Sequence, residues 1–362
     1  MRVAVLGATS ATGRRIARDL LERSEVSEVV LLDRSPEALR HLSGQLDEGR
    51  AGTAILGLSV SPLAKALAGC DVGIGTLPRD LKLERVVLRA AIQAELPYLT
   101  ACQDAEMVRV LFSHDAEARD AQTPIVLGAG WTSGITNLLV MRAARLMDRI
   151  LRVRVAWVVP SPGSQGSDWL LCGLQALSGD ASVYEEGRWQ RRHAGSQRQK
   201  VFFPEPVGWK EVGLVSGAEA MTLPRRLDGV EKVVVKGGVW ERGVRRLLPR
   251  LPRDGRRADP LRAKGVTERS RRPASRAIRL VSWASARVDV SGLAGGTPYR
   301  LTYGVVDEIG KLVSAPLIAG ALMLARADGK VSGVGPPEAF IDPDPFFALL
   351  GDQGIRVARL ER

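Results

Sequence analysis

In the first third of the chain, segments whose apolar residues have the spacing of a strand alternate with segments whose apolar residues have the spacing of a helix. Four consecutive apolar residues at 3–6 predict a buried strand, and apolar residues at helical spacing from position 16 predict the helix after it. The same order recurs, with strands expected at 29–32, 53–56, 71–75, 97–100 and 124–127 and helices at 36–46, 63–67, 84–94 and 105–119. Strands that alternate with helices predict a mostly parallel α/β sheet.

The pattern changes after position 149. Apolar and polar residues alternate at 151–157 and 284–290, which predicts half-buried antiparallel strands, and the second of these is expected to form a hairpin with 299–306. Further short strands are expected at 202–209, 212–215 and 230–239, and buried helices at 312–324 and 346–350. A last strand at 355–357 is expected to return to the first sheet. The second half is therefore predicted to be an α+β domain.

The first strand runs into a turn of small residues that predicts a dinucleotide-binding site. Its spacing is G-x-x-S-x-x-G rather than the common G-x-G-x-x-G. Small residues let the backbone approach a pyrophosphate, and the first N–H groups of the next helix then point at that anion. Ser10 fits if its φ stays negative, and its hydroxyl would add a phosphate donor. The alternative is a strand-to-helix turn of another α/β protein. The residues expected to bind cofactor here are Gly7, Thr9, Ser10, Ala11, Thr12 and Gly13.

An acidic residue at the end of the second strand supports this interpretation. Asp33 follows the glycine turn by about twenty residues, where dinucleotide-binding folds place the carboxylate that holds the adenosine ribose. The carboxylate favours NAD over NADP, although Arg34 could accept a 2′-phosphate. The alternative is an exposed strand end that precedes a capped helix.

Two later loops lie at the same edge of the predicted sheet. Thr76, Leu77 and Pro78 follow a strand and are expected to line the nicotinamide side. Gly130 and Trp131 belong to the glycine-rich stretch 128–137, which opens a helix and could hold the cofactor amide or a substrate carboxylate. The alternatives are a plain loop for the first and a hinge between domains for the second.

Composition narrows the class of protein. Three cysteines and three histidines lie far apart, so neither a disulfide framework nor a metal centre is expected: Cys70, Cys102, Cys172, His41, His114 and His193. The apolar run 312–325 is short and interrupted, so no membrane span is expected. No signal-like segment precedes the first strand, and we expect a cytoplasmic protein.

Positive charge is concentrated in one segment. The formal net charge is +12, and residues 242–279 hold 14 Lys and Arg against 3 Asp and Glu, while the rest of the chain holds 38 against 37. We expect a solvated loop, with an anionic substrate, an acidic protein partner or nucleic acid as alternatives. Only Trp240 and Trp283 lie near this segment, so nucleic acid is the weakest of these.

Short motifs along nearly the whole chain resemble the saccharopine dehydrogenase family. They are the N-terminal turn, Asp33-Arg34, and the stretches 90–92, 98–99, 130–137, 203–206, 222–224, 237–240 and 335–338. The resemblance implies a Rossmann-type, doubly wound parallel sheet at 1–130. It also implies an inserted α+β domain at 131–335, for substrate binding and dimerisation, and a segment 336–362 that returns to the first domain.

The resemblance also implies NAD(P)-linked hydride transfer at a carbon–nitrogen bond of an amino-acid-derived amine or imine. We also expect a homodimer, because the open sheet predicted for the second domain is suited to covering a substrate or to pairing with another subunit. One position departs from the family, because Thr132 stands where the saccharopine-forming branch typically carries an aspartate that is a candidate catalytic group. The catalytic residue is therefore open, with Cys102, Thr132 and Asp168 as weak candidates beside Asp104, Tyr184, Glu205 and Lys210. The competing hypothesis is an inactive cofactor-binding sensor or scaffold, whose arginine-rich loop binds an acidic partner.

Overall fold

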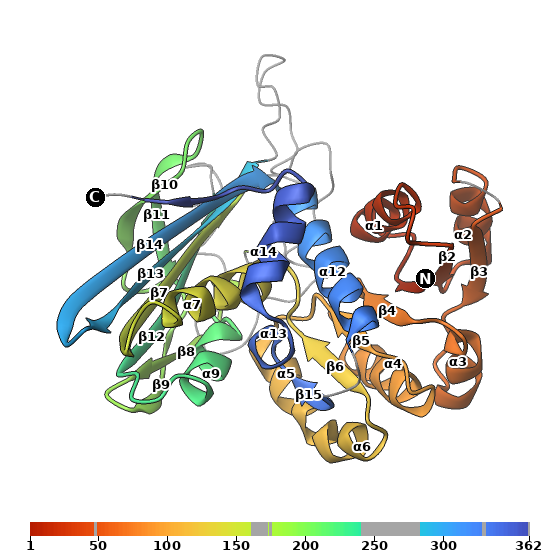
Figure 1. Ribbon diagram of the computed structural model, residues 1–362, viewed down its shortest axis with the longest axis horizontal. Helices are drawn as coiled ribbons and strands as arrows, with labels where there is room; N and C mark the ends of the chain where they lie inside the picture. The colour runs from red at the N-terminus through yellow and green to blue at the C-terminus, as the bar shows by residue number, and fades with distance from the viewer. Residues whose placement is uncertain (47–48, 161–172, 174–175, 240–282, 328–330, 361–362) are drawn as a thin grey trace. The chain divides into compact units, whose positions relative to one another are not determined.

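The computed structural model describes the chain except residues 47–48, 161–172, 174–175, 240–282, 328–330 and 361–362 (Figure 1). It contains two compact units. Unit 1 consists of Met1–Leu138 and Val313–Gln353, and unit 2 of Leu139–Leu312 and Gly354–Arg362. The expected boundaries at 130 and 335 differ from this division. The first crossover falls about eight residues later, inside a helix, and the chain returns to unit 1 well before position 336.

Unit 1 is built on a seven-stranded parallel sheet, as predicted. The strand order is β15-β6-β5-β4-β1-β2-β3. The strands are β1 (Arg2–Leu6), β2 (Glu28–Asp33), β3 (Ala51–Ile55), β4 (Val72–Gly75), β5 (Tyr98–Thr100), β6 (Pro124–Leu127) and β15 (Gly333–Gly335). Every pair is parallel. β1, β4 and β6 are continuous apolar runs because such strands are buried on both faces.

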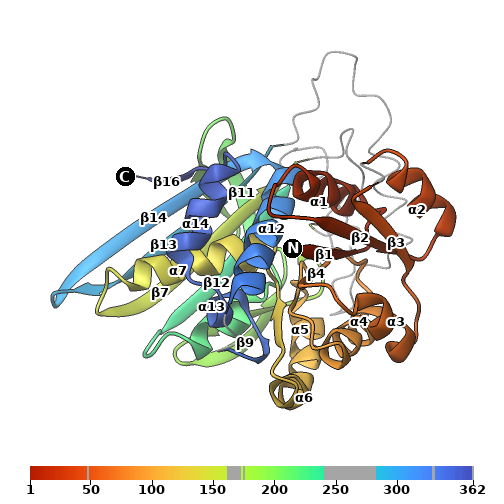
Figure 2. The same ribbon diagram turned by 45° about the vertical axis from the view of Figure 1, so that its right-hand side comes forward.

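Helices cover both faces of this sheet, with α1 and α2 on one side and α3 and α4 on the other (Figure 2). They are α1 (Ala11–Leu21), α2 (Pro36–Ser43), α3 (Val60–Leu67), α4 (Leu81–Gln93), α5 (Ala105–Leu111) and α6 (Asp115–Asp120). The single helix expected at 105–119 is wrong, since a short 3₁₀ turn at Phe112–His114 divides α5 from α6. Asp115 begins α6 and its Oδ1 accepts the N–H of Val334 at 2.8 Å, which ties this break to the edge strand β15.

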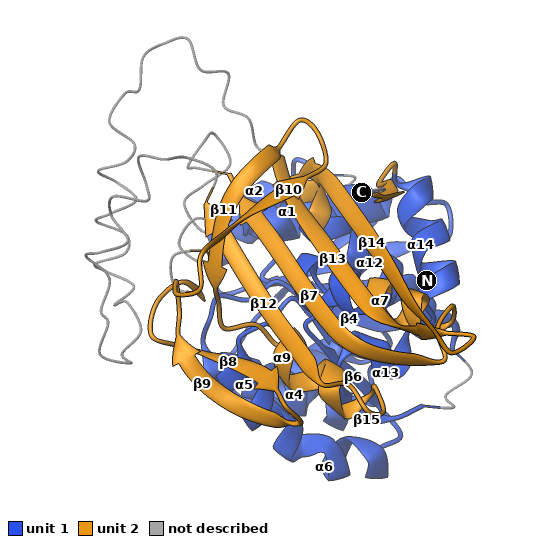
Figure 3. Cartoon of the chain, turned by 90° about the vertical axis from the view of Figure 1, so that its left-hand side faces the viewer, with its two compact units in different colours: residues 1–138, 313–353 blue, residues 139–312, 354–362 orange. Residues whose placement is uncertain are grey.

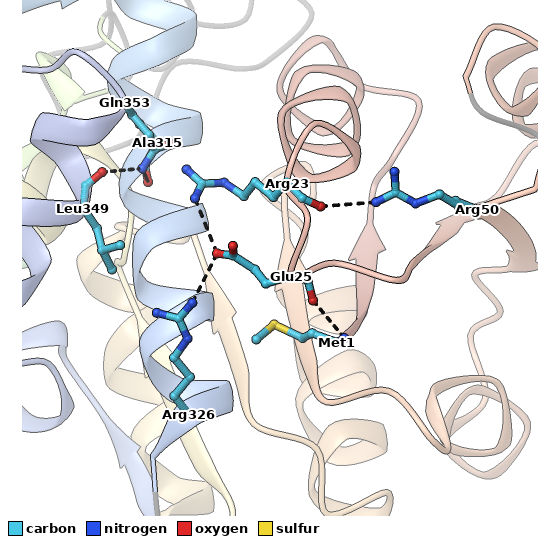
Figure 4. Close-up of polar contacts among 8 residues, drawn as sticks. All are labelled: Met1, Arg23, Glu25, Arg50, Ala315, Arg326, Leu349 and Gln353. Carbon is cyan, nitrogen blue, oxygen red and sulfur yellow. Dashed lines mark hydrogen bonds and ion pairs between the residues drawn. The ribbon is translucent and has the colours of Figure 1, made fainter.

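The C-terminal return to unit 1 is made by α12 (Ile309–Arg326), α13 (Pro337–Phe340) and α14 (Pro343–Asp352). Glu25 accepts Arg326 at 3.2 Å and Arg23 at 3.7 Å (Figure 4). Gln353 donates to the carbonyls of Ala315 and Leu349 in the same view. These contacts join the two separate pieces of unit 1 and fasten α14 to α12.

Among the described residues, α12 is the one helix long and apolar enough to cross a membrane, and 78% of its apolar window is buried. A Cβ on Gly320, in the middle of α12, would lie 3.1 Å from Leu99 and 3.3 Å from Ile341. This close approach is typical of a core helix, as expected from the interrupted apolar run.

Unit 2 contains a mixed sheet with the order β10-β11-β12-β7-β13-β14-β16, and β8 and β9 extend it beside β12 (Figure 3). Its strands are β7 (Arg149–Val159), β8 (Asp180–Glu185), β9 (Arg188–His193), β10 (Gln199–Phe203), β11 (Gly208–Leu214), β12 (Lys232–Val239), β13 (Trp283–Ala294), β14 (Thr297–Glu308) and β16 (Val357–Arg359). The helices α7 (Thr136–Ala144) and α9 (Glu219–Thr222) accompany it. The predicted β13–β14 hairpin is confirmed.

Two strand predictions for this part of the chain are wrong. The single strand expected at 202–209 is a hairpin of β10 and β11, because Pro204 and Pro206 supply no N–H and Gly208 has a φ of +64°. The strand expected at 355–357 to join the first sheet instead pairs with β14, with Tyr303 opposite Arg359 and Val305 opposite Val357. The edge of β14 offers unpaired backbone groups to the end of the chain.

Candidate functional site

The candidate site lies in unit 1, at the carboxyl ends of the parallel strands. β1 and β4 are neighbours there, yet the chain leaves β1 toward β2 and β3 and leaves β4 toward β5 and β6. Ligands of such sheets bind at this reversal of strand order. The loops that follow β1, β2 and β4 carry most of the cofactor-binding residues predicted from the sequence.

The glycine turn after β1 is closed tightly. Gly7 has a φ of +83°, and a Cβ there would lie 2.8 Å from the carbonyl oxygen of Thr76. A Cβ on Gly13 would lie 2.7 Å from the Cα of Ala8 and would also clash with the carbonyl oxygen of Gly7. No larger residue fits either position without displacing backbone. The turn therefore brings the N-terminus of α1 against the end of β1.

Ser10 is half-buried and caps the helix that follows the turn. Its φ is −66°, as its place in the motif requires, and its hydroxyl accepts the N–H of Gly13 at 3.0 Å. The same hydroxyl lies 3.2 Å from that of Thr76, which donates to the carbonyl of Gly7 at 3.0 Å. The oxygen of Ser10 thus caps the helix, while its O–H proton is still available to Thr76 or to a phosphate. Its role as a phosphate donor stays a prediction.

The remaining donors at this helix end are backbone groups. The N–H groups of Ala11 and Thr12 belong to the first turn of α1, where no preceding helical carbonyl can accept them. Together with the helix dipole they favour an anion at this position. A pyrophosphate meets these requirements, so the turn fits a dinucleotide.

Asp33 stands at the end of β2 and holds the glycine turn. Its Oδ2 accepts the N–H of Thr9 at 2.9 Å and the hydroxyl of Thr9 at 2.6 Å, and its Oδ1 accepts the N–H of Arg34 at 2.7 Å. A carboxylate oxygen can accept two hydrogen bonds, so Oδ1 of Asp33 keeps capacity for a ribose hydroxyl. Arg34 is exposed beside it. Asp33 therefore has a structural role in addition to the predicted ligand role.

These two roles of Asp33 are separable by mutation. Asp33→Ala is expected to weaken NAD binding more than NADP binding, because it removes a ribose acceptor and also a charge that repels a 2′-phosphate. Thr9→Val removes only the hydroxyl bond to Asp33. Thr9→Val is expected to lower the affinity for NAD and for NADP alike, by about tenfold. Dissociation constants of the three proteins for both cofactors test this, and equal losses in Asp33→Ala would restrict Asp33 to holding the turn.

A buried acid that the sequence reasoning missed lies behind the ends of β4 and β5. Glu84, in α4, is 2% exposed and accepts hydrogen bonds from Thr100 at 2.9 Å and from Tyr98 at 3.4 Å. Burial raises its pKa to about 7, against the opposing effect of these two hydroxyls. The sequence could have indicated this buried acid, because Glu84 lies among Leu83, Val87 and Leu88 on the apolar face of the helix.

The glycine-rich loop after β6 is buried and fastened to the loop after β5. Gly128 has a φ of +78°, and Ser133 donates to its carbonyl at 3.0 Å. The hydroxyl of Thr132 donates to the side-chain oxygen of Gln103. Gly130 packs against Ala101, and Trp131 is 5% exposed. Gly130 and Trp131 thus stand at the carboxyl end of β6 next to the loop after β5, and their contact with cofactor stays a prediction.

The candidate catalytic residues have different surroundings. Burial, and next the charge of Glu84, raise the pKa of the Cys102 thiol well above its usual value, so it stays protonated. Asp104 caps α5 and pairs with Arg79 at 2.6 Å. Thr132 is held by Gln103, and Asp168 lies outside the described residues. Tyr184, Glu205 and Lys210 belong to unit 2. In the described part of unit 1, none of the candidates is a free carboxylate base.

The expectation that the protein has no metal centre can be compared with the structure only for the described residues. Among the described residues, no group of three or more His, Cys, Asp or Glu side chains is arranged to hold a metal ion. The basic segment 242–279 lies outside the described residues.

Comparisons with known proteins identify the fold. No protein-family model matches the sequence, and no curated protein matches it either. Among solved structures, the chain is similar to the apo, L-Glu-forming saccharopine dehydrogenase of Saccharomyces cerevisiae, with a TM-score of 0.71 and 14% identity over 99% of this chain and 100% of that one. The Corynebacterium glutamicum DAP dehydrogenase matches with a TM-score of 0.49 and 13% identity over 97% and 95%. The first likeness confirms the Rossmann-type sheet with a second mixed-sheet unit.

Proposed function

We propose that this chain is an NAD(P)-dependent oxidoreductase and that NAD is its preferred cofactor. The observation that carries the proposal is the 7–13 turn. It is closed against Thr76 and tied to Asp33, and it leaves the N–H groups of Ala11 and Thr12 for an anion. The fold shared with saccharopine dehydrogenase supports this assignment.

The residues of unit 1 divide the binding of such a cofactor among them. Asp33 would hold the adenosine ribose, and Ala11 and Thr12 the pyrophosphate. Thr76, Leu77 and Pro78 follow β4 on the far side of β1 from Asp33, so they would line the nicotinamide side, with Gly130 and Trp131 beyond β5. When bound, the nicotinamide accepts or donates the hydride, and the protein supplies position and electrostatics.

We further propose that the substrate is an amino-acid-derived amine or imine and that hydride transfer occurs at its carbon–nitrogen bond. Exchange of a proton at that nitrogen requires a side chain near the nicotinamide side. The protonated thiol of Cys102 and the hydroxyl of Thr132 are hydrogen-bond donors on the neighbouring loops after β5 and β6. Neither is a base, so the substrate is expected to differ from saccharopine.

A turnover assay tests this proposal. The protein is incubated with NADH and a panel of amino acids, each paired with 2-oxo acids and aldehydes, and NADH oxidation is followed by absorbance. We expect steady turnover with at least one pair, together with a new secondary amine detected by mass spectrometry. Tight NADH binding without turnover on the whole panel would contradict the enzymatic assignment.

The second candidate is a cofactor-binding sensor or scaffold without catalysis. It is favoured by Thr132, which stands where the saccharopine-forming branch of the family typically carries an acid and whose hydroxyl donates a hydrogen bond to Gln103. In this case the segment 242–279 would bind an acidic partner. Removal of that segment would then abolish a salt-sensitive interaction and leave NADH binding unchanged.

A further inference from the structure

One face of the mixed sheet of unit 2, which we call the open face, has no described helix over it (Figure 3), although two clusters of buried apolar residues occupy part of it. In Figure 3 its strands face the viewer with α7 and α9 behind them, and no described helix lies in front. On β7, Arg152 and Arg154 are exposed while Val153 and Val155 are buried, so the strand presents alternate residues to opposite faces. The arginines therefore mark the open face.

Strand register shows which other charges share this face. Residues paired directly across two strands point to the same side. Arg152 is paired with Lys232, Ala156 with Lys236, and Arg154 with both Val234 and Asp289. Arg287 on β13 and Arg300 on β14 follow by the same alternation. On β9, Arg188 and Arg192 follow through Glu185 and Ala181 of β8. The cations of this face therefore include Arg152, Arg154, Arg188, Arg192, Lys232, Lys236, Arg287 and Arg300.

All of these cations except Arg154 and Lys236 have carboxylate partners among the described residues. Arg188 pairs with Glu186 at 3.6 Å and Arg192 with Glu185 at 3.7 Å. Arg287 and Arg300 share Asp289, each at 2.9 Å. Asp289 also accepts the hydroxyl of Thr302 at 2.9 Å. Lys232 pairs with Glu185 at 2.6 Å, and Arg152 approaches Glu231 at 3.9 Å. Although Asp289 lies opposite Arg154, its oxygens are already used by other donors.

Arg154 and Lys236 are the two cations of this group without a carboxylate partner among the described residues. Among the described residues, no carboxylate oxygen lies within 4.0 Å of either side chain. Lys236 is only 9% exposed, and its ammonium donates to two neutral oxygens, the carbonyl of Gln197 at 2.7 Å and Oε1 of Gln199 at 2.8 Å. A nearly buried cation with no counter-charge is costly, and an anion would offset that cost.

The two residues are near neighbours in the sheet, and the ammonium of Lys236 is held by Gln197 and Gln199 on the side of β12 away from β7. Arg154 and Lys236 stand on adjacent strands and are offset by two residues, which puts their Cα atoms about 8 Å apart. Only the small Val234 and Ala156 lie between them. Burial, and next the positive charges of Arg154 and Lys232, lower the pKa of Lys236, which shows that these cations act on one another.

We propose that Arg154 and Lys236 form a binding site for a compact oxyanion, the phosphate or carboxylate group of a small molecule, on the open face of the second sheet. The planar guanidinium supplies two parallel donors, and the ammonium supplies a third. This site belongs to unit 2 and is independent of the cofactor-binding proposal for unit 1.

The test uses the full-length protein with inorganic phosphate as the probe, at constant ionic strength set with chloride. Phosphate is expected to bind and to raise the unfolding temperature. Arg154→Gln and Lys236→Met are each expected to weaken the binding by about tenfold or more. The matched control Arg152→Gln removes an exposed, ion-paired cation of the same face. It is expected to alter the phosphate affinity by less than about twofold. Phosphate bound at α1 of unit 1 would be unaffected by all three variants.

Two further probes define the ligand. Citrate that binds with the same dependence on Arg154 indicates a general oxyanion site, and phosphate binding without citrate binding indicates a phosphate ligand. Phosphate and citrate binding that is identical in wild type, Arg154→Gln and Lys236→Met would overturn the proposal. Binding of polyglutamate alone would also overturn it, in favour of an acidic protein partner. Arg154 is exposed, so its variant keeps the test valid even if Lys236→Met fails to fold.

Discussion

Replacing Gly13 by alanine is expected to abolish measurable NADH binding. The added Cβ would lie 2.7 Å from the Cα of Ala8, and it would clash with the carbonyl of Gly7. These neighbours are backbone atoms of the closed turn, so relief requires that α1 move away from β1. That movement displaces the N–H groups of Ala11 and Thr12 and breaks the cap between Ser10 and the N–H of residue 13. We expect a loss of at least about a hundredfold in affinity and about 1–3 kcal/mol in stability.

The matched control for Gly13→Ala is Gly351→Ala. Gly351 lies in α14 of the same unit, and a Cβ there meets no atom within 4 Å. The control is expected to bind NADH like wild type and to be slightly more stable, because alanine favours helix over glycine by about 1 kcal/mol. Calorimetric titration and urea unfolding measure both quantities. Wild-type affinity in folded Gly13→Ala would show that the turn does not hold the cofactor.

Glu84→Gln is expected to remove most of a pH-dependent loss of stability. The pKa of Glu84 rises from its ordinary value of 4.5 to about 7 in the folded chain because the carboxyl is buried. Between these pH values the folded state binds more protons than the unfolded state, so stability falls as the pH rises. The loss begins near the unfolded pKa and is complete above the folded one. Between pH 5 and pH 8 it amounts to about 2–3 kcal/mol.

The measurement is urea unfolding at pH 5 and pH 8 for wild type, Glu84→Gln and the control Glu37→Gln, which alters an exposed glutamate of α2. We expect wild type and Glu37→Gln to lose the same stability between the two pH values, and Glu84→Gln to lose about 2–3 kcal/mol less. For each protein we compare the change in unfolding free energy between the two pH values. A pH-independent cost of placing an amide beside Tyr98 and Thr100 therefore cancels. Parallel slopes for all three proteins would show that Glu84 is ionised normally.

The first sheet was predictable because its strands are buried on both faces and therefore appear in the sequence as continuous runs of apolar residues. β1, β4 and β6 each follow this rule, and Asp33 stands at the expected distance from the glycine turn. The β13–β14 hairpin was predictable for another reason, since one of its faces is polar and the alternation appears in the sequence. In both cases the local pattern reports the burial that the tertiary structure imposes.

What was missed depends on contacts between distant residues. β15 is a Gly-Val-Gly strand with almost no local signal, and Thr123 and Asp115 hold it by hydrogen bonds. The partner of β16 is decided by which sheet edge is open, which no local pattern records. The contact between Ser10 and Thr76 was likewise not visible in the sequence, because the two residues are 66 positions apart.

A nicotinamide dinucleotide is expected to bind at the N-terminus of α1, and calorimetric titration of the wild-type protein with NADH, with NADPH in parallel, measures this binding. We predict one site per chain with micromolar affinity for NADH, weaker binding of NADPH, and loss of the heat signal in Gly13→Ala. If a folded wild-type protein binds neither cofactor at millimolar concentration, the turn after β1 is not a dinucleotide site.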